Sequence, residues 1–222
     1  GTANSSAVQN PIHAFSVDSI FHVRLIVGNL NGCHSTIEKT ISVGSKPIAD
    51  FSSDIVCKGT PTHFTDNSIP NASYITTWDW DFGDNSPHLH VQNPTHVYVF
   101  SGIYPVTLTV INSNGCTQIK TKNTEVLPGP TAAFLNSSLN CAGSVVSFFD
   151  QSSTTLGYLS QWTWNFGDGD STTINFPTPQ DVTHIYTSAG NYNVKLTVHT
   201  SEGCINSTTK LLVVEANPVA NF

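Results

Sequence analysis

Three copies of one sequence pattern run through the chain, and this internal repeat limits the fold more than any other feature does. The segment "NPTHVYVFSGIYPVTLTVINSNGC" (93–116) aligns without a gap with "NPIHAFSVDSIFHVRLIVGNLNGC" (10–33) and with "DVTHIYTSAGNYNVKLTVHTSEGC" (181–204). A second pattern marks where modules start: "PIADF" at 47, "PTAAF" at 130 and "PVANF" at 218. We therefore expect the second half of one module at 1–46, whole modules at 47–129 and 130–217, and the first strand of a further module at 218–222.

Apolar residues within a module recur at every second position, which is the period of a β-strand. Val106, Leu108 and Val110 alternate with Thr107 and Thr109, so one face of this segment is apolar and the other is polar. Such segments are short and are separated by Gly, Asn, Asp and Pro within modules of about 85 residues, which is typical of antiparallel β-sandwiches. The expected fold class is all-β.

Two aromatic segments occupy matching places in the whole modules, "WDWDFGDN" at 78–85 and "WTWNFGDG" at 162–169. In each segment three rings stand two positions apart and share one face of a strand, and each ring of this size buries about 150–250 Å². We expect these rings to form the structural core: Trp78, Trp80 and Phe82 in one module, and Trp162, Trp164 and Phe166 in the other.

The carboxylates of these segments indicate turns and not catalysis. Asp79 and Asp81 are replaced by Thr163 and Asn165 in the second module, and chemistry that needs paired carboxylates would not survive this exchange. Two other carboxylates recur, each directly after Gly in a sequence suited to a tight hairpin turn: Asp84 and Asp168. No Ser or Cys nucleophile with a positioned base can be named, so no catalytic residue and no enzyme activity is expected.

Composition excludes several classes of partner. Charged residues make up 10% of the 222 residues, against about 25% in an average soluble protein. The net charge is −7 and no basic stripe is present, so nucleic acid is not an expected partner. No apolar run approaches the roughly 18–20 residues needed to cross a bilayer. Because the chain lacks Met and starts at Gly1, we expect an excerpt of a longer precursor.

Three motifs together resemble the PKD domain family, first named from the polycystic kidney disease protein. They are "W-x-W-x-F-G-D", then "H-x-Y", then "G-x-Y-x-V-x-L-x-V", and they repeat in register over nearly the whole chain. The cysteine-bearing "VCKGT" and "NSNGC" are similar to versions common in surface and secreted proteins of the Bacteroidota. The resemblance implies tandem Ig-like antiparallel β-sandwich domains outside the cell. It implies no particular ligand, because family members serve as spacers, adhesive stalks and accessory modules of secreted hydrolases.

Two functions are weighed on this basis. The favoured one is an extracellular structural or adhesive repeat segment, a stalk or filament part of a larger secreted or cell-surface protein. Its partners would be neighbouring modules or subunits of the same protein, with surface polysaccharide or protein as further candidates. The alternative is a carbohydrate-binding accessory module of a secreted polysaccharide hydrolase, which requires exposed aromatic platforms. The candidates for such platforms are Tyr74, Tyr158 and Phe100, although each is also expected to pack at a sheet edge.

No metal or cofactor site is expected. Some PKD modules attached to secreted collagenases bind Ca²⁺ through an acidic loop, so the resemblance leaves Ca²⁺ as the alternative to no cofactor. The corresponding loops here have only Asp66 and Asp150 as carboxylates, while Ca²⁺ takes six to eight oxygens. One repeat position holds a histidine in every copy, with no second ligand at zinc spacing: His13, His96 and His184. His88 and His90 share a strand face without a counterpart in the second module, which suggests fortuitous metal affinity rather than a selected site.

The five cysteines occupy two repeat positions. Cys57 and Cys141 precede the second strand of a module, whereas Cys33, Cys116 and Cys204 follow the last turn. If the modules have the Ig topology that the resemblance implies, these two turns lie at opposite ends, about 23 Å apart. That distance disfavours the within-module pairs Cys57–Cys116 and Cys141–Cys204 and favours Cys57–Cys204 across the joint, with the remaining cysteines joining modules outside this segment. Both schemes stay open at this level.

The first half module raises a separate question. Its expected strands, 21–27 and 36–43, carry an apolar face that the segment 1–46 cannot cover by itself. There are three alternatives: the segment is disordered, another chain covers the apolar face, or the protein continues upstream and covers it.

Overall fold

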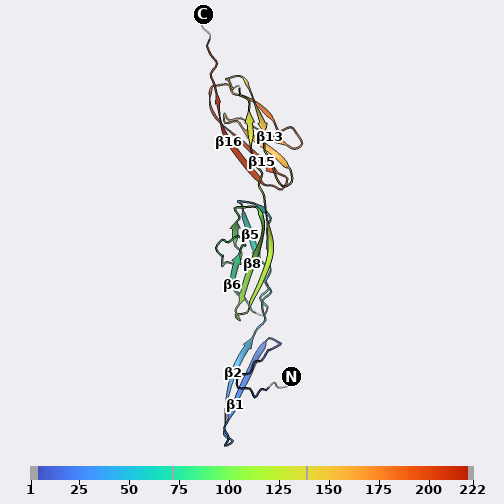
Figure 1. Cartoon of the computed structure of the whole chain (residues 1–222), viewed down its shortest axis with the longest axis vertical. Coiled ribbons are helices and arrows are strands. Elements are labelled where there is room, and N and C mark those ends of the chain that lie inside the picture. Colours follow the sequence, from blue (N-terminus) through green and yellow to red (C-terminus); the bar gives the residue numbers. More distant parts are fainter. Residues whose placement is uncertain (1–4, 72, 139, 220–222) are drawn as a thin grey trace. The chain divides into compact units, whose positions relative to one another are not determined.

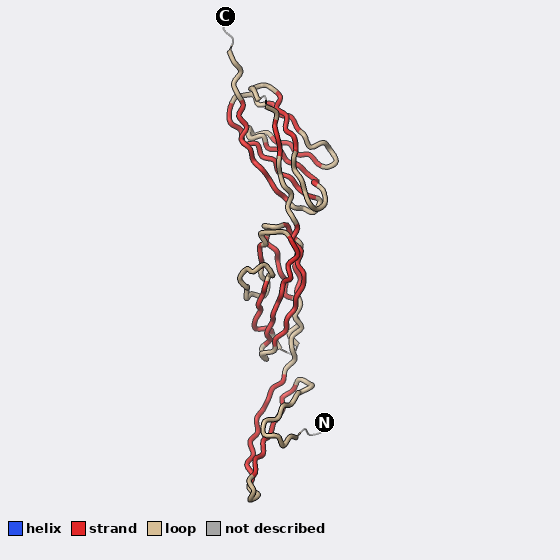
Figure 2. The backbone as a smooth tube through the Cα atoms, viewed as in Figure 1, coloured by secondary structure: helices blue, strands red, loops and turns tan. Residues whose placement is uncertain are grey.

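The computed structural model describes residues 5–71, 73–138 and 140–219. Strands joined by loops make up all of the regular structure in these residues, which confirms the all-β class (Figure 2). The described residues also contain no helix with the length and apolarity that a bilayer crossing requires.

The first whole module consists of two sheets. One has the order β3 (Phe51–Ser53), β5 (Pro61–Asp66), β7 (Thr95–Val97), and the other has the order β4 (Val56–Cys57), β9 (Thr117–Leu127), β8 (Gly102–Asn112), β6 (Ile75–Asp81). Figure 1 shows β5, β6 and β8 together in this module. β6 runs antiparallel to β8 with Trp80 opposite Leu108, whereas β4 is parallel to β9.

The second whole module repeats this plan with one strand exchanged: β13 is added, and the counterpart of β4 is reduced to an isolated parallel bridge between Cys141 and Glu215. Its first sheet has the order β10 (Phe134–Asn136), β11 (Val145–Asp150), β14 (Val182–Ile185). The second sheet has the order β13 (Ser171–Asn175), β12 (Leu159–Asn165), β15 (Gly190–Thr200), β16 (Ile205–Val214) (Figure 1). Alternating residues of β15 (Val194, Leu196 and Val198) are fully buried, as expected for a strand with one face in the core.

Aromatic rings from both sheets of a module meet in its core. The Trp80 ring lies 5.2 Å from Phe51 and 5.5 Å from Phe64, measured between centroids, and its exposed fraction is 0%. The second module repeats the cluster with the corresponding residues: Trp164, Phe134 and Phe148. Phe82 and Phe166, at the end of the aromatic segments, are also buried.

Trp78 differs from the burial expected of it. Its counterpart Trp162 is buried, but Trp78 is only partly buried. The reason is the extra strand of the second module, in which Ile174 lies opposite Trp162 and packs against the core. Among the described residues of the first module, the pairing at this place is an isolated bridge between Trp80 and Leu89 in place of a strand.

The N-terminal segment forms a hairpin of β1 (Ser19–Gly28) and β2 (His34–Val43), paired from Ser19↔Val43 to Gly28↔His34. Its apolar residues remain exposed: Ile20, Val23, Leu25, Ile26, Val27, Ile37 and Ile41. Val23, Leu25 and Val27 share one face with Ile37 and Ile41, whereas Ile20 and Ile26 lie on the other, so the expected apolar face is present on a regular hairpin.

The chain divides into two compact units, and the boundary between them runs through the first whole module. One unit comprises Gly1–Ser52, Phe64–Pro94 and Pro105–Lys122, and the other comprises Ser53–His63, Thr95–Tyr104 and Asn123–Phe222. Cys57 and Cys204 both belong to the second unit, while β6 and the loop that follows it belong to the first.

Candidate functional site

A disulfide joins the two whole modules. Cys57 in β4 is bonded to Cys204, which precedes β16, and the two Cα atoms are 5.6 Å apart although 147 positions separate the residues in sequence. The structure forms neither of the within-module pairs. In the chain-entropy model, closing a loop of this length lowers the entropy of the unfolded chain by an amount equivalent to about 5 kcal/mol.

Backbone pairing and turn geometry position the two sulfur atoms. Cys57 lies opposite Leu127 in the short parallel pairing of β4 with β9, at the end of the first module. Cys204 closes a turn in which the Thr200 amide donates to the Cys204 carbonyl at 2.8 Å and the Cys204 amide donates to Thr200 Oγ1 at 3.0 Å. Asn206 then donates from Nδ2 to the carbonyl of Pro130 in the joint, at 2.7 Å.

The other cysteines carry free thiols in this chain. Cys33 is exposed, whereas Cys116 and Cys141 are partly buried. Cys116 occupies the repeat position of Cys204, and its Sγ lies 3.4 Å from the carbonyl oxygen of Gly44 in the preceding joint. Of the three cysteines at this repeat position, Cys116 and Cys204 thus both lie close to a joint between modules.

A hydrogen bond between tryptophan and aspartate recurs in both modules. Trp78 Nε1 donates to Asp66 Oδ2 at 2.7 Å, and Trp162 Nε1 donates to Asp150 Oδ2 at 2.9 Å. The other carboxylate oxygen of each aspartate accepts a backbone amide two residues further on, from Ser68 or Ser152. Both carboxylates on which a calcium loop would depend are therefore used by protein donors.

The recurring turn aspartates hold their hairpins together. Asp84 Oδ1 accepts the Ser86 amide and Asp168 Oδ1 accepts the Asp170 amide, both at 3.1 Å. Gly167, directly before Asp168, has a φ of +84°, and a Cβ there would lie 2.8 Å from the Asn193 backbone, so the turn requires glycine.

In the second module this turn is also tied to the repeated histidine. Asp168 Oδ2 lies 2.6 Å from His184 Nε2, and the His184 ring stacks on Phe166 at 4.1 Å and meets Tyr186 edge-on. The Tyr186 hydroxyl donates to the Phe166 carbonyl at 2.9 Å. Burial, followed by the nearby Asp168 and Tyr192, raises the pKa of Tyr186 far above its ordinary value, so the phenol stays protonated.

Asp168, Asp170 and His184 also place three ligand-type atoms within 4.8 Å of one another. The first module retains the corresponding Asp84 but has Ser86 in place of Asp170. His184 is largely buried, and its Nε2 already faces the Asp168 carboxylate. The arrangement therefore serves the packing of the turn. Of its three residues, only Asp168 and His184 have a counterpart of the same type in the first module.

The Asp168–His184 pair leads to a pH prediction. Burial raises the pKa of Asp168, but the hydrogen bonds from His184 and the Asp170 amide and the charge of His184 outweigh it, so the pKa lies below its ordinary value. A carboxyl with a lowered pKa in the folded state stabilises the fold above the pKa of the unfolded state, about 3.9, and loses this contribution as pH falls through the folded value. We expect Asp168→Asn to lower the free energy of unfolding near pH 6, and the difference from wild type to shrink below about pH 4. Urea titrations across this range measure it, and a difference independent of pH would contradict the assignment.

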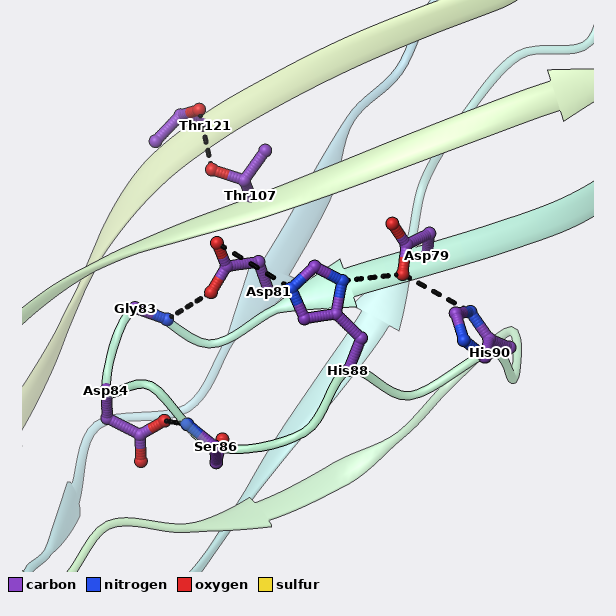
Figure 3. Close-up of polar contacts among 9 residues, drawn as sticks. All are labelled: Asp79, Asp81, Gly83, Asp84, Ser86, His88, His90, Thr107 and Thr121. Atoms are coloured by element: carbon purple, nitrogen blue, oxygen red, sulfur yellow. Dashed lines mark hydrogen bonds and ion pairs between the residues drawn. The ribbon is translucent and has the colours of Figure 1, made fainter.

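A second group of charged side chains lies on the outer face of β6. From the sequence, its two histidines were expected to share a strand face without forming a site. His88 and His90 come from the segment after the turn, and both reach Asp79 on β6 (Figure 3). His88 also faces Asp81, at 4.0 Å between Nε2 and Oδ2. The sequence placed the two histidines on one face, but their common carboxylate could not be found without knowing which residues the chain brings opposite β6.

The three candidate aromatic platforms, Tyr74, Phe100 and Tyr158, are all exposed. Tyr74 and Phe100, with exposed fractions of 68% and 75%, are in loops of the first module that belong to different compact units. Tyr158 is 53% exposed and lies 5.0 Å from the ring of Phe176, so these two form a small exposed aromatic pair in the second module. They are the structural basis for the carbohydrate-binding alternative.

Comparison with known proteins agrees with the motifs. The family model described as the PKD domain matches residues 44–126 and 128–215. Human polycystin-1 is 29% identical over 210 residues, which is 92% of this chain and 5% of that protein. A microbial collagenase of Vibrio alginolyticus is 34% identical over 88 residues, 39% of this chain and 10% of that protein. The chain thus spans a small fraction of these relatives.

Solved structures include single modules of the same kind. The crystal structure of the PKD1 domain of Vibrio anguillarum Epp is 32% identical and covers 40% of this chain and 96% of that chain, with a TM-score of 0.35. The PKD1 domain of the Vibrio cholerae metalloprotease PrtV is 28% identical, covering 37% of this chain and 98% of that chain, with a TM-score of 0.34. Because the family model covers both whole modules and more than half of the sequence, this chain belongs to the PKD domain family.

Proposed function

We propose that the chain is an extracellular structural repeat segment, a stalk or filament part, whose modules are tied to each other by covalent bonds beyond the backbone. The observation that carries this proposal is the disulfide between Cys57 and Cys204. A bond within a module would stabilise that module only, whereas this bond links one module to the next. A repeat array joined in this way resists separation of its modules under tension, which a stalk must do.

Cysteine placement supports a periodic use of the same bond. Cys141 occupies the repeat position of Cys57, and both Cys33 and Cys116 occupy that of Cys204. In the proposed array, each would pair with the complementary cysteine of an adjacent module. Disulfides persist in oxidising compartments, so the arrangement favours a location outside the cell. Relatives with PKD modules include polycystin-1 and a microbial collagenase, which fits a module used within larger proteins.

The recurring carboxylates, which would be the candidates for a catalytic role, are hydrogen-bonded to other side chains of the module. The carboxylates of Asp66 and Asp150 accept indole protons, and that of Asp168 is bound to His184. We therefore propose a non-catalytic role for this segment.

Carbohydrate binding is the second candidate, because Tyr158 and Phe176 form an exposed ring pair on which a sugar could stack. Electrophoresis in native gels with embedded polysaccharide separates the two functions. The stalk proposal predicts that the chain migrates as it does without polysaccharide, and that Tyr158→Ala and Tyr74→Ala migrate like wild type. Retardation by a polysaccharide that is lost in either variant would contradict the stalk as the sole function and favour the accessory-module alternative. Bovine serum albumin in the same gels is the control for non-specific retardation.

A further inference from the structure

The hairpin of β1 and β2 has the strand pairing of a whole module, but among the described residues these two strands pair only with each other (Figure 1). Val23 lies opposite Lys39, as Val194 lies opposite Lys210 between β15 and β16. The three alternating apolar side chains on this face of β1 are 41–56% exposed. Their counterparts in β8 and β15 all have an exposed fraction of 0%: Val106, Leu108, Val110, Val194, Leu196 and Val198.

The segment before β1 keeps a ring contact of the whole modules as well. Phe15 lies 4.2 Å from Phe21 between ring centroids, and the equivalent rings of the first whole module, Tyr98 and Tyr104, lie 4.1 Å apart. The second half of a module is thus arranged here as it is in a complete one. A surface that is organised in advance loses little conformational entropy when a partner covers it.

In both whole modules an aromatic strand pairs with the counterpart of β1. The second Trp of this strand lies opposite a leucine in each case, Trp80 opposite Leu108 and Trp164 opposite Leu196. Leu25 occupies the same repeat position in β1. An edge strand presents a row of unpaired backbone N–H and C=O groups, which is a template for a further strand. The edge of β1 therefore has the register that an aromatic strand of this repeat requires.

A lysine connects the facing sheet to this strand pair in both whole modules. Lys122 Nζ donates to the Phe51 carbonyl and lies 5.4 Å from the centroid of the Phe51 ring. Lys210 Nζ makes the same two contacts with Phe134, at 5.0 Å from the ring. Lys39 occupies this repeat position in the hairpin and is exposed. The hairpin thus offers a cation at the place where a covering strand brings a carbonyl and a ring.

We propose that the hairpin is a binding surface for the first half of another module of this repeat, supplied by the same polypeptide. Its W-x-W-x-F strand pairs antiparallel with β1, with the second Trp opposite Leu25, and the Phe carbonyl of its P-x-A-x-F strand accepts a hydrogen bond from Lys39. Backbone pairing supplies affinity in such strand addition, and the apolar face selects the rings. In both whole modules the covering half directly precedes its strand pair, at 47–83 and at 130–167, which favours the same polypeptide over a second chain.

A second copy of the hairpin fits this face less well. Two such faces packed together would bury Lys39 of each copy without a carboxylate, because the residues that share the face, read from the pairing of β1 with β2, include no acid. A buried ammonium group without a partner is costly. In the first whole module, by contrast, the covering half supplies Asp50, whose carboxylate lies 2.7 Å from Lys122 Nζ.

The test restores a covering half at the assigned place. The 222-residue chain is compared with an extended chain that carries a copy of residues 47–83 directly before Gly1, which occupies the repeat position of Asp84. Both chains have Ser in place of the free cysteines and of the copied Cys57. An isolated two-stranded hairpin is at best marginally stable, so we expect hydrogen exchange in β1 and β2, measured by mass spectrometry, to slow at least tenfold on extension.

A cysteine cross-link tests the register. Asp79 lies opposite Thr109, whose repeat position in β1 is that of Ile26. Residues directly opposite in an antiparallel pair have Cα atoms about 4.5–5.5 Å apart, within the range of a disulfide. In the extended chain, Ile26→Cys should therefore form a disulfide with Asp79→Cys of the copy, whereas Arg24→Cys, two positions away, should not.

Matched variants separate the two faces of the hairpin. In the extended chain, Leu25→Asp should abolish the slower exchange, whereas Ile26→Asp on the outer face should keep it. Lys39→Gln should reduce the slowing, and Glu38→Gln should leave it unchanged. Sedimentation should show the 222-residue chain as a monomer. Unchanged exchange on extension, equal effects of Leu25→Asp and Ile26→Asp, a cross-link at position 24 instead of 26, or a dimer of the 222-residue chain that Leu25→Asp dissociates would each overturn the proposal.

Discussion

Under tension applied at its two ends, the oxidised chain is expected to extend by far less than its 222 residues would allow, because the disulfide removes the segment between Cys57 and Cys204 from the load-bearing path. The excluded segment contains most of both cores, including Trp80 and Trp164. With 147 positions between the two cysteines and about 3.4 Å per extended residue, reduction should release about 500 Å of additional length.

Single-molecule force spectroscopy measures this difference directly. Cys57→Ser with Cys204→Ser should give the long extension without reductant, and the matched triple variant of the free cysteines (Cys33, Cys116 and Cys141 to Ser) should keep the short one. Equal extensions for the oxidised chain and the Cys57/Cys204 variant would show that the bond does not form in solution. That result would remove the main support for a covalently joined array.

Trp164→Ala is expected to be the most destabilising core substitution in the second module. The side chain is fully buried between Phe134 and Phe148, with ring centroids 5.1 and 5.6 Å away. Deleting a buried Trp ring typically costs about 3–5 kcal/mol, a large part of the stability of a domain of this size. Urea unfolding followed by near-UV circular dichroism measures the loss, and Tyr158→Ala, at an exposed ring, is the control with a small expected effect. A loss below about 1 kcal/mol for Trp164→Ala would contradict the central place of this ring.

The milder change to Phe should separate the two equivalent tryptophans. Trp80 Nε1 donates to the Val91 carbonyl at 2.9 Å, whereas the buried Trp164 Nε1 has no partner among the described residues. Trp80→Phe therefore breaks a hydrogen bond and leaves a carbonyl unpaired, whereas Trp164→Phe removes an unsatisfied donor. We expect the first to cost about 1 kcal/mol more than the second, measured in the same unfolding experiments. The reverse order would contradict this account.

Repetition explains why so much of the fold could be predicted. The alternation of Val106, Leu108 and Val110 marks a strand with one buried face, and the structure buries all three. Comparing copies separated the recurring Asp84 and Asp168 from the non-recurring Asp79 and Asp81, and so indicated turns at the recurring positions. Trp78 shows the limit, because its burial depends on a neighbouring strand that only the second module has.

The candidate site could be predicted only in part, for a physical reason. Asp66 and Trp78 are twelve positions apart, and Asp79 and His90 lie on opposite sides of a hairpin turn. Strand periodicity states which face a residue occupies but not which residue faces it across the sheet, since this depends on register. The bond between Asp168 and His184 was missed for this reason, although each residue recurs in the sequence.

The sequence by itself determined that the chain is a tandem array of β-sandwich modules, because period-two alternation and repetition are local properties that can be read without coordinates. The tertiary structure decided which cysteines, which Asp–Trp pairs and which Asp–His pairs meet. These contacts depend on strand register and on the approach of distant segments, and a distance of 5.6 Å between two Cα atoms 147 positions apart arises only once the chain has folded.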